Sequence, residues 1–156
     1  MPLFRVVRTV HRARHREEAS MSDEDESAVR AAYEAYGQGE VNRLLELVHP
    51  DLEWTYLDPS MENPQPQTCH GREQLARMLG QQADRGFVSQ VEEIASSGDK
   101  VMVAVRTPGA DQRRAWQSGD RSYLVLTMDC GRIVALRDFR ERDEARGFAG
   151  LGQGKR

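Results

Sequence analysis

The sequence predicts a single α+β domain in which helices precede an antiparallel sheet. Helical spacing of apolar residues dominates the first half of the chain, and strand-like segments joined by tight turns dominate the second half. A length of 156 residues is enough for one hydrophobic core. A parallel βαβ fold is disfavoured because helices and strands do not alternate along the chain.

Three helices are expected from apolar residues that recur three or four positions apart. Residues 26–37 place four apolar side chains on one helical face, and residues 41–48 form a shorter segment of the same kind. A third helix begins near Gly71 and ends at Gly80 or by Gly86. The first two helices therefore come before most of the predicted strands.

The strands are predicted from β-branched and aromatic runs bounded by turn residues. They cover residues 52–57, 87–95, 100–107, 123–128 and 133–139, with a further short strand near Trp116. Hairpin turns are expected at Ser96-Ser97-Gly98-Asp99 and at Asp129-Cys130-Gly131. Residues 58–70 hold three prolines and form an irregular loop, a feature that is usually functional or mobile in a small domain.

The last predicted strand is largely apolar on both faces. Strict alternation puts Ile133, Ala135 and Phe139 on one face and Val134 and Leu136 on the other. A strand of this kind is covered on both sides, so we expect the helices on one side and a second subunit on the other. Alternation also groups Asp138 with Val134 and Leu136, where an acid is either paired, with Arg121 or Arg106, or functional.

The two ends of the chain differ from the middle. Residues 1–22 are predicted to be a basic flexible extension with five arginines, or an upstream addition if the working domain starts at Met21. The domain itself is expected over residues 23–148, followed by a flexible tail over 149–156. From Glu141 the chain is charged and then glycine-rich, so fraying is expected there.

Composition excludes several classes of function. A net charge of −3 gives no reason to expect nucleic acid as a partner, and no apolar run approaches the roughly 20 residues that cross a bilayer. Two cysteines make neither a disulfide framework nor a zinc site, which favours a reducing, cytoplasmic setting. No spacing of histidine, cysteine and acidic residues predicts a metal.

Two segments carry a resemblance to a known family. Cys69-His70-Gly71-Arg72-Glu73-Gln74-Leu75 opens the third helix, and Gly131-Arg132-Ile133-Val134-Ala135-Leu136-Arg137-Asp138-Phe139 forms the last strand. With the order of elements, they resemble the nuclear transport factor 2-like superfamily, and most closely its SnoaL-like group, which is related to polyketide cyclases and ketosteroid isomerases. The resemblance covers residues 24–148. It implies a cone-shaped curved sheet wrapped around the N-terminal helices, a homodimer and an apolar pocket.

The resemblance to ketosteroid isomerases implies candidate catalytic residues. Asp58-Pro59 looks like the family's aspartate base, whereas a gapless alignment from Gly39 places Tyr56 there, and both alternatives stay open. The family's helix-one tyrosine aligns with Ala32, one residue from Tyr33, and its protonated aspartate aligns with Tyr123. Two of three catalytic positions thus depart from that pattern.

The chain also resembles limonene-type epoxide hydrolases, which use an Asp-Arg-Asp set. Arg137-Asp138-Phe139 looks like the ending that holds one aspartate, and Arg121 and Tyr123 occupy the spacing of the arginine and the second aspartate. The set therefore lacks one carboxylate. His70 is a further candidate acid or base beside the irregular loop.

These residues lead to two functional hypotheses. The first is a cofactor-free isomerase, cyclase or dehydratase for a small apolar oxygenated molecule, with Asp138, Asp58 or His70 as acid or base. In it, Tyr123 and Arg121 orient the substrate. The pocket wall is expected to hold Trp54, Tyr56 and Tyr33. The alternative is a non-catalytic ligand-binding or dimerisation module; a sealed cone with Asp138 paired to an arginine favours it, whereas an open cavity where Asp138, Tyr123 and His70 converge favours the enzyme.

Overall fold

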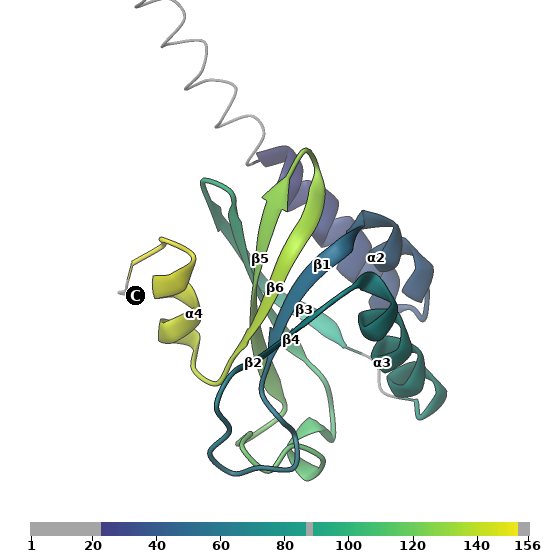
Figure 1. Ribbon diagram of the computed structural model, residues 1–156, viewed down its shortest axis with the longest axis vertical. Helices are drawn as coiled ribbons and strands as arrows, with labels where there is room; N and C mark the ends of the chain where they lie inside the picture. The colour runs from purple at the N-terminus through teal and green to yellow at the C-terminus, as the bar shows by residue number, and fades with distance from the viewer. Residues whose placement is uncertain (1–22, 87–88, 153–156) are drawn as a thin grey trace, which may run out of the picture.

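The computed structural model describes residues 23–86 and 89–152, so the extension predicted over residues 1–22 lies outside the described residues. Within the described part, the chain forms a six-stranded curved sheet in the order β2-β1-β6-β5-β4-β3 (Figure 1). The strands are β1 (Val48–Tyr56), β2 (Gln67–His70), β3 (Gln90–Ser97), β4 (Lys100–Arg106), β5 (Arg121–Asp129) and β6 (Arg132–Phe139). The predicted α+β class is confirmed.

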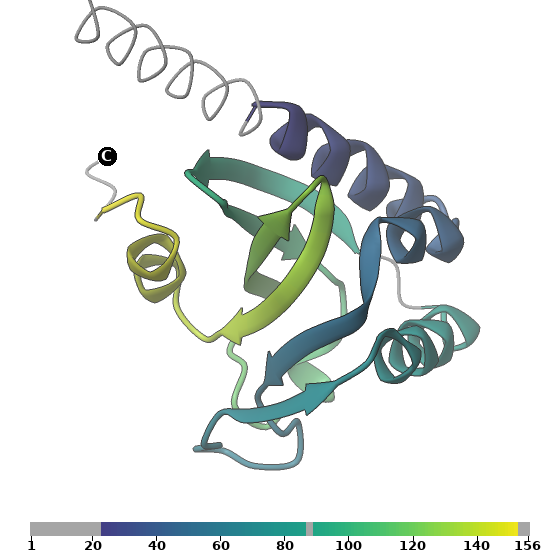
Figure 2. The same cartoon turned by 45° about the horizontal axis from the view of Figure 1, so that its top comes forward.

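The helices lie on both sides of this sheet. A helix over residues 23–37, α2 (Val41–Leu47) and α3 (Arg72–Asp84) lie on the concave side, and α4 (Arg142–Phe148) lies on the opposite side (Figures 1 and 2). The main core fills the space between the concave face and the three helices. The prediction of a short strand near Trp116 is wrong, because that segment holds the 3-10 helix η1 (Ala110–Gln112) and turns.

One strand pair departs from the predicted antiparallel sheet. β1 runs parallel to β6, while every other neighbouring pair is antiparallel. A parallel pair needs a long connection, which α3 and the β3–β5 strands supply between β1 and β6. Local spacing of apolar residues carries no information about such a distant pairing.

A bulge in β6 changes which residues face the core. Thr127 pairs with Ala135 and Met128 pairs with Ile133, so Val134 is an extra residue on the β6 side. Ile133 and Leu136 consequently both lie in the main core. The strict alternation that put these two side chains on opposite faces is therefore wrong.

The predicted fraying from Glu141 is also wrong. Ala145 and Ala149 are 0% and 1% exposed, and they pack on Met102 and Val125 of the convex face. Glu93 accepts two hydrogen bonds from the Arg142 guanidinium, at 2.8 and 2.7 Å, which ties the start of α4 to β3. The helix thus covers part of the face at which a second subunit is expected.

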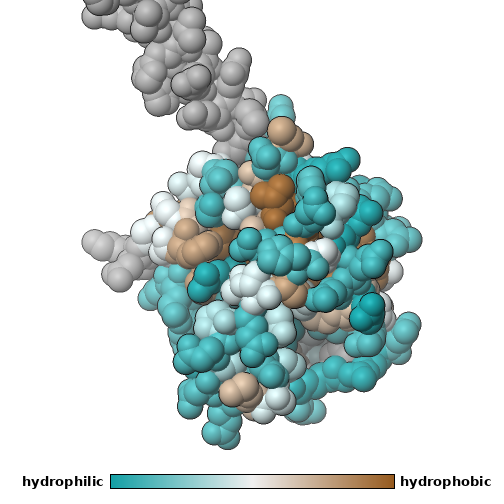
Figure 3. Space-filling model, in the orientation of Figure 1, coloured by the Kyte–Doolittle hydropathy of each residue, from teal (hydrophilic) through white to brown (hydrophobic). Residues whose placement is uncertain are grey.

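The outer surface of the described residues is mainly polar. Met61 and Phe148 are the large apolar side chains with strong exposure there, and the face in Figure 3 is correspondingly hydrophilic over most of its area. Among the described helices, none combines the length and the apolar character needed to cross a membrane.

Candidate functional site

A cavity of about 70 Å³ lies between the concave face of the sheet and the helices. It adjoins a larger hollow of about 560 Å³ at the end of α3, near η1. The two spaces share the lining residues Trp54, Met78, Gln82, Thr107, Arg114 and Asp138. This pair of spaces is the candidate site.

Asp138 is the acidic residue that lines both spaces. It pairs with Leu124 across the β5–β6 hairpin, on the core side of the sheet. Its carboxylate is surrounded by protein atoms, while the residue as a whole keeps some accessible surface where it faces the cavity. Burial raises the pKa of Asp138 to about 6. The positive charge of Arg114 and hydrogen bonding from the Leu57 backbone N–H and the Trp54 indole act in the opposite direction, and burial outweighs them.

Arg114 is the cation that faces this carboxylate. It comes from the turn after η1, and its Nη1 donates hydrogen bonds to Gln117 Oε1 at 3.0 Å and to Ser122 Oγ at 2.9 Å. Its guanidinium carbon also lies 5.7 Å from the centre of the Trp116 ring. These contacts fix the guanidinium near Asp138 and Tyr36, on whose pKa values its charge acts.

Two tyrosines from the first described helix complete the inner wall. Tyr33 and Tyr36 are each 5% exposed and meet edge to face with ring centres 6.3 Å apart. Burial raises the pKa of both phenols, and the charge of Asp138 raises that of Tyr33 further. Both phenols therefore stay protonated over the ordinary pH range; the Tyr36 hydroxyl donates to Gln82 Oε1 at 3.1 Å.

The two tryptophans of the chain also line the cavity. Their buried indole Nε1 atoms have no hydrogen-bond partner of good geometry among the described residues. The Trp54 N–H lies close enough to Asp138 to lower the pKa of that carboxyl, although the two groups do not form a hydrogen bond of good geometry. The Trp116 N–H has no hydrogen-bond partner among the described residues. A buried N–H without a partner is costly, and an oxygen acceptor in the cavity would satisfy it.

Comparison with known families identifies the domain. The SnoaL-like domain model matches residues 29–136. The chain belongs to the SnoaL-like family. A search of curated proteins finds no match to this SnoaL-like chain.

Solved structures agree with that assignment at the level of the fold. Bal32a, from a soil-derived mobile gene cassette, is 19% identical, with a TM-score of 0.60 over 85% of this chain and 98% of its own. A proposed polyketide cyclase from Sinorhizobium meliloti is 19% identical, with a TM-score of 0.53 over 72% and 94%. A proposed ketosteroid isomerase from Kribbella flavida is 15% identical, with a TM-score of 0.54 over 78% and 80%.

Two of the predicted acid–base residues of this SnoaL-like domain lie away from the cavity. Asp58 sits in a turn, where its Oδ1 accepts hydrogen bonds from the Ser60 N–H at 2.9 Å and from the Ser60 hydroxyl at 2.7 Å. These bonds lower the pKa of Asp58. His70 ends β2 with 70% of its side chain exposed, 3.9 Å from Glu53. Neither lines the cavity or the hollow.

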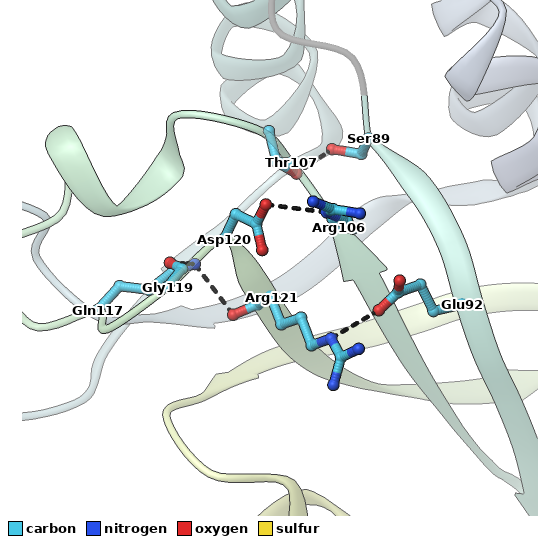
Figure 4. Close-up of polar contacts among 8 residues, drawn as sticks. All are labelled: Ser89, Glu92, Arg106, Thr107, Gln117, Gly119, Asp120 and Arg121. Atoms are coloured by element: carbon cyan, nitrogen blue, oxygen red, sulfur yellow. Dashed lines mark hydrogen bonds and ion pairs between the residues drawn. The ribbon is translucent and has the colours of Figure 1, made fainter.

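The two predicted orienting residues point to the convex face. Tyr123 pairs with Phe139, one position from the pair that Asp138 forms with Leu124. It borders the cavity, but it packs against the convex-face residues Met102, Val125, Ala145 and Ala149 beside α4. Arg121 forms an ion pair with Glu92 at 2.8 Å (Figure 4). Asp138, Tyr123 and His70 therefore do not converge, and the arrangement that would have favoured an enzyme over a binding module is not the one observed.

The alternative in which Asp138 pairs with Arg121 or Arg106 is contradicted by the structure. Arg106 binds Asp120 at 2.9 Å rather than Asp138 (Figure 4), and Arg121 is held by Glu92. The cation near Asp138 is Arg114, which the sequence-based reasoning missed. Its position depends on how η1 and the following turn fold back over the sheet, and the one local signal is the Arg113-Arg114 pair preceding Trp116.

Three residues predicted for the pocket wall, Trp54, Tyr56 and Tyr33, lie at these two spaces. Trp54 and Tyr33 line the cavity, and Tyr56 lines the adjoining hollow, with its ring 5.1 Å from that of Trp54. The Tyr56 hydroxyl donates to Gln67 Oε1 at 3.0 Å. The described residues contain no cluster of three histidine, cysteine or acidic side chains suited to a metal ion.

Proposed function

We propose that this SnoaL-like domain binds a small apolar molecule that carries a carbonyl oxygen, and that Asp138 moves a proton on it without a cofactor. The observation that carries the proposal is a buried carboxyl with a pKa of about 6 that lines an otherwise largely apolar cavity. Such a pKa keeps both protonation states populated near neutral pH, as an acid–base group requires.

The proposed step is proton transfer next to the carbonyl group. The Asp138 carboxylate takes a proton from the neighbouring carbon, the C–H electron pair moves to form an enolate, and Asp138, after exchanging that proton with solvent water, returns a proton to carbon or oxygen. The developing negative charge on oxygen is stabilised by donors that already line the cavity: the Tyr33 phenol, the Trp116 indole N–H and the charge of Arg114. Isomerisation, cyclisation and dehydration all use this step.

The test needs no knowledge of the natural substrate. We would incubate the protein with 2-tetralone in D2O and follow hydrogen–deuterium exchange at the carbons beside its carbonyl by NMR. The native protein is expected to exceed the buffer rate, and Asp138→Asn to lose about 100-fold or more of that excess. Asp58→Asn is the matched control, because Asp58 lies in a turn outside the cavity. Equal exchange by native protein and Asp138→Asn would overturn the proposal.

A binding-only role is the second candidate. It is favoured by the small volume of the inner cavity, about 70 Å³, and by the charge of Arg114 near Asp138. In that case 2-tetralone raises the melting temperature, because ligand binding to the native state stabilises it, but exchange stays at the buffer rate.

A further inference from the structure

Gln82 lies where the inner cavity meets the outer hollow. It belongs to the last turn of α3, its side chain is half-buried, and it lines both spaces. Its Oε1 accepts the hydrogen bond from the Tyr36 hydroxyl at 3.1 Å, whereas no described residue accepts a hydrogen bond from its Nε2. Gln82 therefore offers a side-chain donor at the junction of the two spaces.

The neighbouring hydroxyl groups decide which atom of this amide is engaged. Tyr36, Ser89 and Thr107 line the same cavity and are 5%, 7% and 7% exposed. The Tyr36 phenol has one proton and gives it to Gln82 Oε1, so toward Ser89 it can only accept. The Ser89 hydroxyl accordingly lowers the pKa of Tyr36, as a donor to the phenol oxygen does. Thr107 is then the donor in its 2.6 Å bond with Ser89 (Figure 4).

The hydrogens of this chain all run in one direction, and the chain ends at Gln82 Oε1. The amide oxygen is thus engaged with the protein, and the two Nε2 hydrogens are left for a ligand. An amide N–H pairs with an ether, carbonyl or hydroxyl oxygen. A purely apolar ligand would take water from this donor and give nothing in return, which weakens its binding.

We infer that Gln82 selects ligands that carry a second oxygen atom, apart from the carbonyl group on which Asp138 acts, and that its Nε2 donates a hydrogen bond to that oxygen. The inference rests on the proposed function in that it uses the same cavity and the same carbonyl compound. It adds a second polar group to the ligand and assigns the residue that recognises it.

The test uses pairs of neutral probes that differ in a single acceptor atom. Methoxy-2-tetralones, with the methoxy group at each free position of the aromatic ring in turn, are paired with the ethyl-2-tetralone of the same position, in which CH2 replaces the ether oxygen. All positions are used because the orientation of the bound ring decides which of its carbons faces Gln82. Calorimetric titration gives the ratio of the two affinities, methoxy over ethyl, for each pair.

Two variants of Gln82 and a matched control decide the assignment. Gln82→Met keeps the length of the side chain and removes the donor, so it should lower the methoxy-to-ethyl ratio about five-fold for at least one pair. Gln82→Glu keeps an oxygen that can accept from Tyr36 but puts a second acceptor in place of Nε2, so it should lower the ratio by at least as much. Gln74→Glu makes the same change at an exposed residue of α3 that lines neither space, and it should keep the native ratio.

Continued binding of the ethyl probes shows that the cavity of each variant is intact. A native ratio in both Gln82 variants for every pair refutes the role of Gln82 and leaves the proposed function standing, since that function is tested separately by hydrogen–deuterium exchange. An equal fall in Gln74→Glu refutes it as well. If native protein binds 2-tetralone but none of the methoxy compounds, the site has no place for a second oxygen and the inference fails. If 2-tetralone and all the substituted probes fail to bind native protein, the inference and the proposed function fail together.

Discussion

Replacing Asp138 with asparagine should change how the stability of the domain depends on pH. The folded-state pKa is raised from 3.8 to about 6. The folded state therefore holds its proton more tightly than the unfolded chain does. The stabilisation from this proton is fully present below about pH 4 and is lost as the pH rises through about 6.

The size of the effect follows from the shift. About two pKa units at 1.36 kcal/mol each give about 3 kcal/mol over the whole range, of which about 1 kcal/mol falls between about pH 5 and about pH 8. Asparagine does not titrate, so the Asp138→Asn variant lacks this loss. Its free energy of unfolding relative to native protein should rise by about 1 kcal/mol across that interval.

Urea unfolding at a series of pH values measures this difference. The attraction to Arg114 acts only on the ionised carboxylate, so it is already contained in the pKa of about 6 and belongs to the slope that is measured. Asp58→Asn is a control of opposite sign, since hydrogen bonds from Ser60 lower the pKa of Asp58 and the stabilisation they confer is lost as the pH falls. If the free energy of unfolding of native protein and of Asp138→Asn changed with pH in parallel, the claim that Asp138 is buried with a raised pKa would be refuted.

Two further predictions concern the sheet and its outer helix. Ile133→Ala should destabilise the domain by about 3 kcal/mol and Val134→Ala by less than about 1 kcal/mol, as measured by urea unfolding. The reason is that the bulge buries Ile133 and leaves Val134 partly exposed. A larger loss of stability in Val134→Ala than in Ile133→Ala would contradict the bulge. Glu93→Gln should lower stability by about 1 kcal/mol at neutral pH by breaking the bidentate contact with Arg142. Because Arg142 holds the pKa of Glu93 below its usual range, the native and Glu93→Gln unfolding curves should converge in acid, and a difference that persists there would contradict this explanation.

Local signals in the sequence were enough to predict the first three helices and the two hairpin turns. The two-residue turn at Cys130 and Gly131 has φ values of 51° and 76°, the left-handed geometry that the Asp-Cys-Gly signal favours. Apolar spacing likewise placed Tyr33 on a buried helical face. These features depend on residues that are close together in the chain.

The features that were missed depend on distant contacts. The β1–β6 parallel pair and the bulge at Val134 are set by strand pairing, and the bulge decides which side chains share a face with Asp138. α4 forms because Ala145 and Ala149 find a sheet face to cover, although the local sequence is charged and rich in glycine. The fold of a turn brings the charge of Arg114 near Asp138, whereas sequence spacing pointed to Arg121 and Arg106 as possible partners.

The central claim is that a buried carboxyl at position 138 titrates near neutral pH inside the cavity. The most direct measurement is an NMR titration of the aspartate side-chain carboxyl carbons, with the Asp138 signal assigned by its loss in Asp138→Asn. A midpoint of about 6 is predicted for that signal. A midpoint at or below the ordinary aspartate value of about 3.9 would contradict the claim.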